Sequence, residues 1–223
     1  MEHIRLGLKE NRKQFWLLVF INALVGGMIG LERTLLPDIA AQEFHLTSAS
    51  VILSFIIVFG LFKAITNYFT GILASRFGRK RLLLSGWLIG LPIPFILMYG
   101  NSWNWIIFAN ILLGINQGLT WSSTVTMKID LVGGKERGFA MGLNEFAGYG
   151  AVALVAWATS NIAANYGLRP YPFMIGIVIV MTGTLLSWLF VKDTSGHVNM
   201  ETQQDNSIPL LKNVFTETSW LNK

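Results

Sequence analysis

The sequence predicts an all-α, polytopic membrane protein with six transmembrane helices, and three observations lead to this prediction. Hydrophobic residues make up 52% of the 223 residues, and the mean hydropathy is +0.51. Only 13% of the residues are charged, about half the share of roughly 25% in an average soluble domain. The apolar residues also form runs of about 20 residues, the length that crosses a ~30 Å hydrocarbon core as a helix.

Six apolar runs are long enough to be spans. We expect Pro37 to end the first span, and Pro92 and Pro94 to kink the third, because proline removes a backbone donor. The first run is too long for a cleavable signal peptide. A basic N-terminus, residues 1–14, precedes the bundle of residues 15–191, and a polar tail, residues 192–223, follows it. The expected spans are about 15–36, 49–74, 82–99, 105–127, 138–162 and 171–191.

The basic residues predict the orientation in the membrane. Cytoplasmic loops carry an excess of Lys and Arg, so the N- and C-termini are both expected in the cytoplasm, in a cell (plasma) membrane. Arg33 and Arg169 then lie toward the outer side, and Lys63 lies within a span. The cytoplasmic side receives all the other cations: Arg5, Lys9, Arg12, Lys13, Arg76, Arg79, Lys80, Arg81, Lys128, Lys135, Arg137, Lys192, Lys212 and Lys223.

Composition and motifs argue against several classes of protein. The net charge of +5 and the isoelectric point near 9.6 would suggest nucleic acid for a soluble protein, but the basic loops of a membrane protein explain them and we expect no nucleic-acid partner. The chain has no Cys, and its three His residues, His3, His45 and His197, fall outside the spans. Together with the absence of catalytic sequence motifs, this predicts that the chain is not an enzyme and has no cofactor, metal or catalytic residue.

Charged and polar side chains inside spans are energetically costly, so each is a candidate for function. Lys63 lies mid-span with Asn67 four residues on, hence on the same helix face. Lys63 is expected either to pair with a buried carboxylate or to face a wet cavity, and Glu145 to serve as counter-charge or proton carrier. Lys128 is expected to be structural. The candidates for binding a substrate or coupling ion are Glu32, Arg33, Lys63, Asn67, Asn116, Gln117, Trp121, Asn144, Glu145 and Tyr149.

For several of these candidates a structural explanation is equally open. Glu32 and Arg33 lie in the outer third of the first span and can reach the interface. Asn116 and Gln117 can be interhelical hydrogen-bond partners. Small residues spaced four apart also predict close helix packing, at the pairs Gly26/Gly30, Gly86/Gly90, Gly114/Gly118 and Gly138/Gly142.

The loop between the second and third spans carries an ordered motif. The stretch GILASRFGRKRLLLSG places glycines and cations in the order Gly71, Leu73, Ala74, Ser75, Arg76, Gly78, Arg79, Lys80, Arg81. This order resembles the signature loop of the major facilitator superfamily, which lies in the same gap, although Ser75 stands where that signature has an acidic residue. The glycine-rich run of residues 142–150 is similar to the fifth helix of the same family, and residues 116–118 resemble its fourth-helix region.

The resemblance implies secondary transport of a small solute by alternating access, coupled to protons as symport or antiport. Members of the family are usually built from two six-helix halves around a central site, and residues 15–193 correspond to the N-terminal half. The tail then resembles the start of the linker between halves. The expected partners are a solute, the lipid bilayer, and either a C-terminal six-helix half or a second copy of the chain. The alternative is a non-transporting scaffold, or the remnant of a truncated gene.

Overall fold

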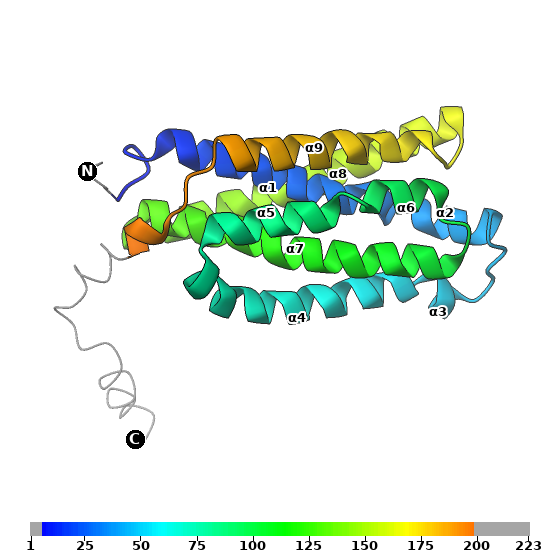
Figure 1. Ribbon diagram of the computed structural model, residues 1–223. Coiled ribbons are helices and arrows are strands. Elements are labelled where there is room, and N and C mark those ends of the chain that lie inside the picture. Colours follow the sequence, from blue (N-terminus) through cyan, green and yellow to red (C-terminus); the bar gives the residue numbers. More distant parts are fainter. Residues whose placement is uncertain (1–5, 199–223) are drawn as a thin grey trace, which may run out of the picture.

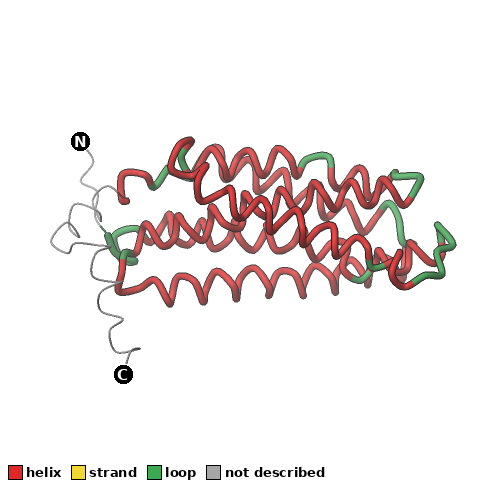
Figure 2. The backbone as a smooth tube through the Cα atoms, turned by 90° about the horizontal axis from the view of Figure 1, so that it is seen from below, coloured by secondary structure: helices red, strands yellow, loops and turns green. Residues whose placement is uncertain are grey.

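The protein is all-α, as the sequence predicts. The computed structural model describes residues 6–198, without the side chain of Lys135, so Arg5, Lys212, Lys223 and most of the expected tail lie outside the described residues. Long helices run side by side as one bundle (Figures 1 and 2). The helices are α1 (Arg12–Arg33), α2 (Leu35–Gln42), α3 (Ala49–Ile52), α4 (Ser54–Phe77), α5 (Arg79–Gly90), α6 (Ile93–Tyr99), α7 (Trp103–Val132), α8 (Arg137–Tyr166) and α9 (Met174–Leu189), with 3₁₀ turns at Gly134–Glu136 and Tyr171–Phe173.

Within the described residues, five helical segments are long and apolar enough to cross a membrane. They are α1 with α2, α3 with α4, α5 with α6, α8, and the segment from Tyr171 to Leu189. The expected fourth span, α7, is not among them. With 30 residues it extends for about 45 Å, more than the hydrocarbon core requires. Its apolar character is diluted by side chains that face the bundle interior, among them Asn110, Asn116, Gln117, Thr120 and Thr124.

Two helix breaks lie near prolines, and the position of the first break differs from the sequence prediction. The first span was expected to end at Pro37. Instead α1 ends at Arg33, and α2 continues through Pro37, which is its third residue. The first N–H groups of a helix have no acceptor within it, so proline at this position removes no hydrogen bond. The predicted interruption of the third span is confirmed, because α5 ends at Gly90 and α6 begins after Pro92.

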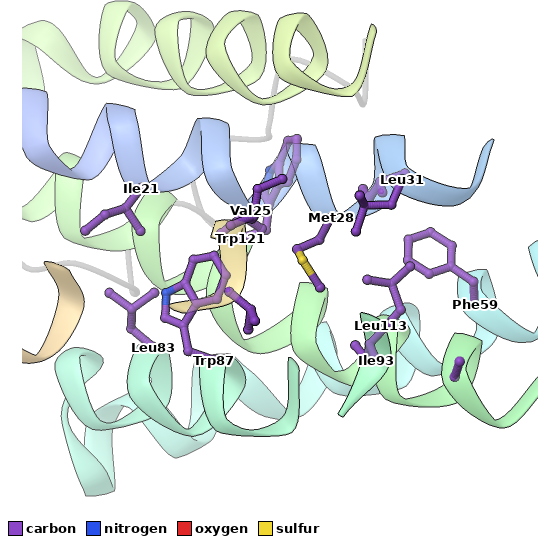
Figure 3. Close-up of a cluster of buried hydrophobic side chains, with 14 of the residues drawn as sticks. Ile21, Val25, Met28, Leu31, Phe59, Leu83, Trp87, Ile93, Leu113 and Trp121 are labelled. Carbon is purple, nitrogen blue, oxygen red and sulfur yellow. The ribbon is translucent and has the colours of Figure 1, made fainter. Parts of the chain in front are cut away.

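Helix α7 lies in the middle of the bundle and contacts α1, α4, α5, α6 and α8. Apolar side chains from these helices meet in one continuous core (Figure 3). Met28 of α1, Trp87 of α5 and Leu113 of α7 are all fully buried there. Because α7 is enclosed on several sides, its polar groups contact protein rather than lipid, so it tolerates a lower hydropathy.

Close backbone approaches explain three of the four predicted glycine pairs. A Cβ atom added to Gly26 would lie 2.0 Å from the Gly148 carbonyl oxygen, and one at Gly30 would lie 2.6 Å from the Val152 oxygen. Helix α1 therefore touches α8 backbone to backbone. The pair Gly114/Gly118 contacts α4 in the same way, and Gly86/Gly90 contacts α7. The fourth pair does not follow the prediction within the described residues, since a Cβ at Gly138 or Gly142 would meet none of their atoms within 4 Å.

An ionic contact joins three connecting segments at the end of the bundle away from the signature loop. Arg169, between α8 and α9, donates from Nη1 to the Gly100 carbonyl oxygen at 2.6 Å and from Nη2 to the carboxylate of Glu43. Its guanidinium also lies over the ring of Phe44, 5.4 Å from the ring centroid. We call this group the Arg169 clasp. It fastens the connections after α2, α6 and α8 to one another.

Candidate solute site

Trp121 of α7 connects charged side chains from two neighbouring helices. The ammonium of Lys63 on α4 lies 4.7 Å from the centroid of the indole ring. The indole N–H donates to Oε1 of Glu145 on α8 at 3.0 Å. Tyr149, one turn further along α8, packs edge-on against the same indole at 5.4 Å between ring centroids. We call Lys63, Trp121, Asn144, Glu145 and Tyr149 the Trp121 cluster.

The indole separates the two charges of the cluster. Among residues 6–198, Lys63 and Glu145 form no ion pair within 4 Å. The cation is instead stabilised by the face of the indole, and the carboxylate by donors from Trp121 and from Asn144 Nδ2, each 3.0 Å away. Glu145 and Tyr149 are exposed, and Lys63 is half-buried. Both charges are therefore accessible from one side of the bundle.

The polar surface continues along α4 and onto α1. Asn67, one turn after Lys63, accepts a hydrogen bond from the Ser122 hydroxyl at 2.8 Å. Arg33 of α1 lies over the ring of Phe59 at 5.0 Å, and the ammonium of Lys63 lies 5.7 Å from the same ring. The structure thus places Arg33 and Asn67 on either side of the Trp121 cluster.

Lys128 belongs to this region, although the sequence suggested only a structural role. It is fully buried, and its ammonium donates to Oδ1 of Asn144, which in turn donates to Glu145. The carboxylate of Glu145 therefore interacts electrostatically with both Lys128 and Lys63. Lys128 follows Trp121 by seven residues, two helical turns, and this spacing is the signal that would have placed it on the same face.

A buried chain of hydrogen bonds supports the cluster from behind. Asn22 of α1 donates to the Asn144 carbonyl oxygen at 2.7 Å and accepts from Thr124 of α7 at 2.8 Å. Gly148 leaves room for the indole, because a Cβ at that position would lie 2.3 Å from the Trp121 ring. Helices α1, α7 and α8 together hold Trp121 and Asn144 in place.

Three predicted candidates lie elsewhere. Asn116 donates to the Gly86 carbonyl oxygen at 2.8 Å and Gln117 to that of Val25 at 2.7 Å, so both link helices inside the core. Glu32 is also fully buried, and its carboxylate oxygens lack a hydrogen-bonding partner among the described residues, although the Asn110 amide lies near. These side chains do not contact the Trp121 cluster.

The arrangement offers charge and aromatic surface. In the described part of the chain, no three His, Asp or Glu side chains come together. Two ammonium groups, one carboxylate and aromatic rings are instead suited to binding a polar or charged solute without covalent chemistry.

Comparison with known proteins identifies the family. The sequence pattern of the Major Facilitator Superfamily matches residues 15–221. The chain belongs to this superfamily. Its members are multi-pass membrane transporters and not enzymes.

Two curated relatives show how much of such a transporter the chain represents. The chain is 26% identical over 200 residues to the proton-coupled antiporter flippase LtaA of Staphylococcus haemolyticus. The aligned region covers 89% of this chain and 48% of that protein. It is 30% identical over 197 residues to the multidrug resistance protein MdtG of Salmonella arizonae, covering 85% and 46%. The chain spans about half the length of the curated relatives it matches.

The loop that resembles the superfamily signature forms a compact joint between α4 and α5. Gly78 has φ = +82°, a conformation that glycine adopts at little cost, and it allows α5 to begin directly after α4. Arg79 pairs with Asp130 at the end of α7 at 3.1 Å. Ser75, in the acidic position of the pattern, is exposed and donates within its own helix, to the Ile72 carbonyl oxygen at 2.7 Å.

Asp193, just after α9, completes this joint. Its Oδ2 accepts the backbone N–H of Lys80 at 2.9 Å, the type of bond with which a capping side chain satisfies the first turn of a helix. Burial acts to raise the pKa of Asp193. Hydrogen bonds from the Ser195 hydroxyl and from the backbone N–H groups of Lys80 and Ser195, with the charge of Arg79, outweigh burial and lower the pKa below its ordinary value of 3.8.

The residues after α9 belong to the expected polar tail, and the part of it that is described folds back onto the bundle. Thr194 donates to Asp130 at 2.6 Å, and Gln14 of α1 bonds the backbone of Phe190 and Lys192. We call this end of the molecule, with the signature loop and residues 192–198, the basic end. It contains the beginning of α1 and the ends of α7 and α9 (Figure 1).

Proposed function

We propose that the chain forms one six-helix bundle of a secondary transporter. In this bundle α7 crosses the membrane in addition to the five candidate spans. In this proposal the Trp121 cluster is the bundle's share of a central solute site. The observation that carries it is that the half-buried Lys63 and the exposed Glu145 lie on the two least buried long helices, α4 and α8. Only 11% of the residues in the most apolar stretch of the span that contains α4 are buried, and 17% in that of α8. In the first span the buried share is 67%.

Energetics supports a second bundle over these two helices. Charged side chains at membrane depth are costly in lipid and therefore face protein or water. The same two helices, α4 and α8, also expose large apolar side chains, including Leu61, Tyr68 and Leu154, so they suit a protein partner. Transporters of this kind bind solute near the midplane, between two repeats. The proposed partner is a C-terminal six-helix half, with a second copy of the chain as the alternative.

We further propose that the solute carries an anionic or strongly polar group and that transport is coupled to protons. Lys63 and Lys128 outnumber the single carboxylate, Glu145, so the Trp121 cluster taken together with Lys128 has excess positive charge. A proton on Glu145 would weaken its electrostatic interaction with both lysines and so link solute binding to protonation. The names of the relatives, a proton-coupled antiporter and a multidrug resistance protein, are compatible with this proposal.

The test uses the natural lysine and a matched control. The chain is produced alone and together with the C-terminal half of the Staphylococcus relative, and solute-driven proton movement in proteoliposomes is followed with a pH-sensitive dye. We expect Lys63→Met to reduce the solute response at least tenfold, because a cation–π contact and a charge in the site are lost. Lys63→Arg should retain part of the response, and Lys13→Met, which removes an exposed cation at the basic end, should retain all of it.

Each possible result has a defined meaning. An unchanged response in Lys63→Met would contradict the assigned site. A response from the chain alone, accompanied by crosslinked dimers, would identify a second copy as the partner. No response to any solute in either pairing would favour a non-transporting scaffold.

A further inference from the structure

A cavity of about 590 Å³ opens at the basic end, separate from the Trp121 cluster. It lies between the last turn of α4, the first turns of α5, and the end of α9 with the residues that follow it. The lining side chains are Ser75, Arg76, Phe77, Gly78, Lys80, Arg81, Leu84, Trp188, Asp193 and Ser195. We call it the α4–α5–α9 pocket.

Two of the three cations in this pocket have no partner among the described residues. Arg76 and Arg81 are exposed, and neither forms a hydrogen bond or ion pair with any of residues 6–198. Lys80 donates from its ammonium to the Trp188 carbonyl oxygen at 2.9 Å. The only carboxylate, Asp193, already accepts from the backbone N–H groups of Lys80 and Ser195 at 2.9 Å each. The pocket therefore retains positive charge that no described side chain neutralises.

The rim of the pocket is apolar and aromatic. Trp188 lies in the last turn of α9 and is 62% exposed, and Phe77 at the end of α4 is 53% exposed. Exposed aromatic rings at the ends of membrane helices mark the level of the lipid headgroups. Arg76 and Arg81 line the same pocket as these rings and thus lie at the level of the lipid phosphates, and Leu84, one turn further along α5, adds apolar surface.

We propose that the α4–α5–α9 pocket binds the headgroup phosphate of an anionic phospholipid. Basic pockets between helix ends at a membrane surface attract anionic lipids, by about 1 kcal/mol for each Lys or Arg. Arg76 and Arg81 hold the phosphate between them, and Trp188, Phe77 and Leu84 contact the first methylenes of the chains. This combination distinguishes a lipid from a soluble anion, which would make no use of the apolar rim.

The test titrates the purified full chain in detergent with phosphatidylglycerol and measures bound lipid by native mass spectrometry. The double variant Arg76→Gln/Arg81→Gln should bind roughly 30-fold more weakly, the loss expected from about 1 kcal/mol per cation. The double variant Arg12→Gln/Lys13→Gln removes the same charge from exposed positions of α1 at the same end and should bind like the parent. Arg76→Lys/Arg81→Lys keeps both charges and should bind nearly as well, which also controls for folding.

Three outcomes would overturn the proposal. Equal weakening in the Arg12/Lys13 control would mean general attraction to a basic surface. Equal binding of phosphatidylcholine would remove the role of net lipid charge. Competition by inorganic phosphate at millimolar concentration would identify a site for a soluble anion.

Discussion

Asp193 provides the capping group that Gly78 cannot provide. Glycine at position 78 permits the sharp joint between α4 and α5 but has no side chain to accept an N–H from the first turn of α5. The carboxylate that accepts it comes instead from Asp193, more than a hundred residues later. One side chain therefore couples the signature loop to the end of α9.

We expect Asp193→Asn to lower stability by about 0.3–1 kcal/mol at neutral pH, because asparagine can still accept the N–H of Lys80 but lacks the negative charge beside Arg79 and the first turn of α5. Because the pKa of Asp193 is lowered in the folded protein, its stabilisation is complete above the unfolded value and is lost as the pH falls through the folded value. The stability difference between parent and variant should therefore be constant above about pH 5 and shrink below pH 3.8.

Thermal unfolding in one detergent between pH 3 and 8 measures this difference. His197, whose pKa is lowered by burial and partly restored by Asp130, is present in both proteins, so its contribution cancels. A difference that grows as the pH falls would contradict the capping role.

Sequence reasoning at the residue scale succeeded where a charge lies in a span and helical spacing defines its face. Lys63 and Asn67 share the face that the spacing of four predicts, and Glu145 and Tyr149 share another. It did not distinguish Glu32 from Glu145, because the two are equally unusual in an apolar run. Only packing shows that α7 encloses the first while the second is exposed. Asp193 was not foreseen either, since its contact depends on the folded path of the chain.

Among the elements, the contact between α1 and α8 is the closest. At Gly26 the α1 backbone leaves no room for a methyl group beside the Gly148 carbonyl, and at Gly148 the Trp121 ring occupies the same kind of space. These two glycines therefore determine how near α8 lies to the core and where the indole of the Trp121 cluster sits.

We expect Gly26→Ala to lower the free energy of unfolding by about 1–3 kcal/mol, because the added Cβ would lie 2.0 Å from a backbone oxygen and the helices must separate. This corresponds to a fall of roughly 2–4 °C in Tm for each kcal/mol. The measurement is thermal unfolding in detergent.

The matched control is Gly142→Ala on α8, where a Cβ would meet nothing within 4 Å. Alanine favours the helix there by up to about 1 kcal/mol, so this Tm should hold or rise. Equal destabilisation by the two substitutions would show that the α1–α8 approach is not the cause.

The sequence could predict close packing at the element scale but not its partners. All four glycine pairs have the same spacing, yet only three lie at contacts, since the pattern contains no information on which helix lies opposite. The hydropathy of α7 was ambiguous for a related reason. A helix enclosed by protein needs no lipid-facing surface, so polar residues are permitted on several sides of it.

For the whole molecule, the distribution of cations predicts that the basic end faces the cytoplasm. The natural chain contains no Cys, so single cysteines give an unambiguous signal. We expect Asn101→Cys, in the exposed connection before α7, to react with a membrane-impermeant maleimide in intact cells. Gly134→Cys, exposed at the basic end, should react only after the membrane is opened.

The opposite labelling pattern would contradict the proposed orientation. Labelling of both positions in intact cells would mean that the cells had lost their permeability barrier, and Lys13→Cys, on the same side as Gly134, serves as the control for this.

The bundle architecture itself followed from the apolar runs, because the bilayer thickness determines helix length. The contacts that close its two ends depend on loops, which have no such periodicity.

Because contacts join its helices at both ends, we expect the bundle to move as one rigid body. The Arg169 clasp joins the connections at one end, and Asp193 with Thr194 joins α5, α7 and the residues after α9 at the other. Any tilt of such a body displaces its ends more than its centre, so small movements near Trp121 become large ones at the membrane surfaces. The distance between spectroscopic labels at positions 101 and 134 should therefore stay constant while the bundle turns.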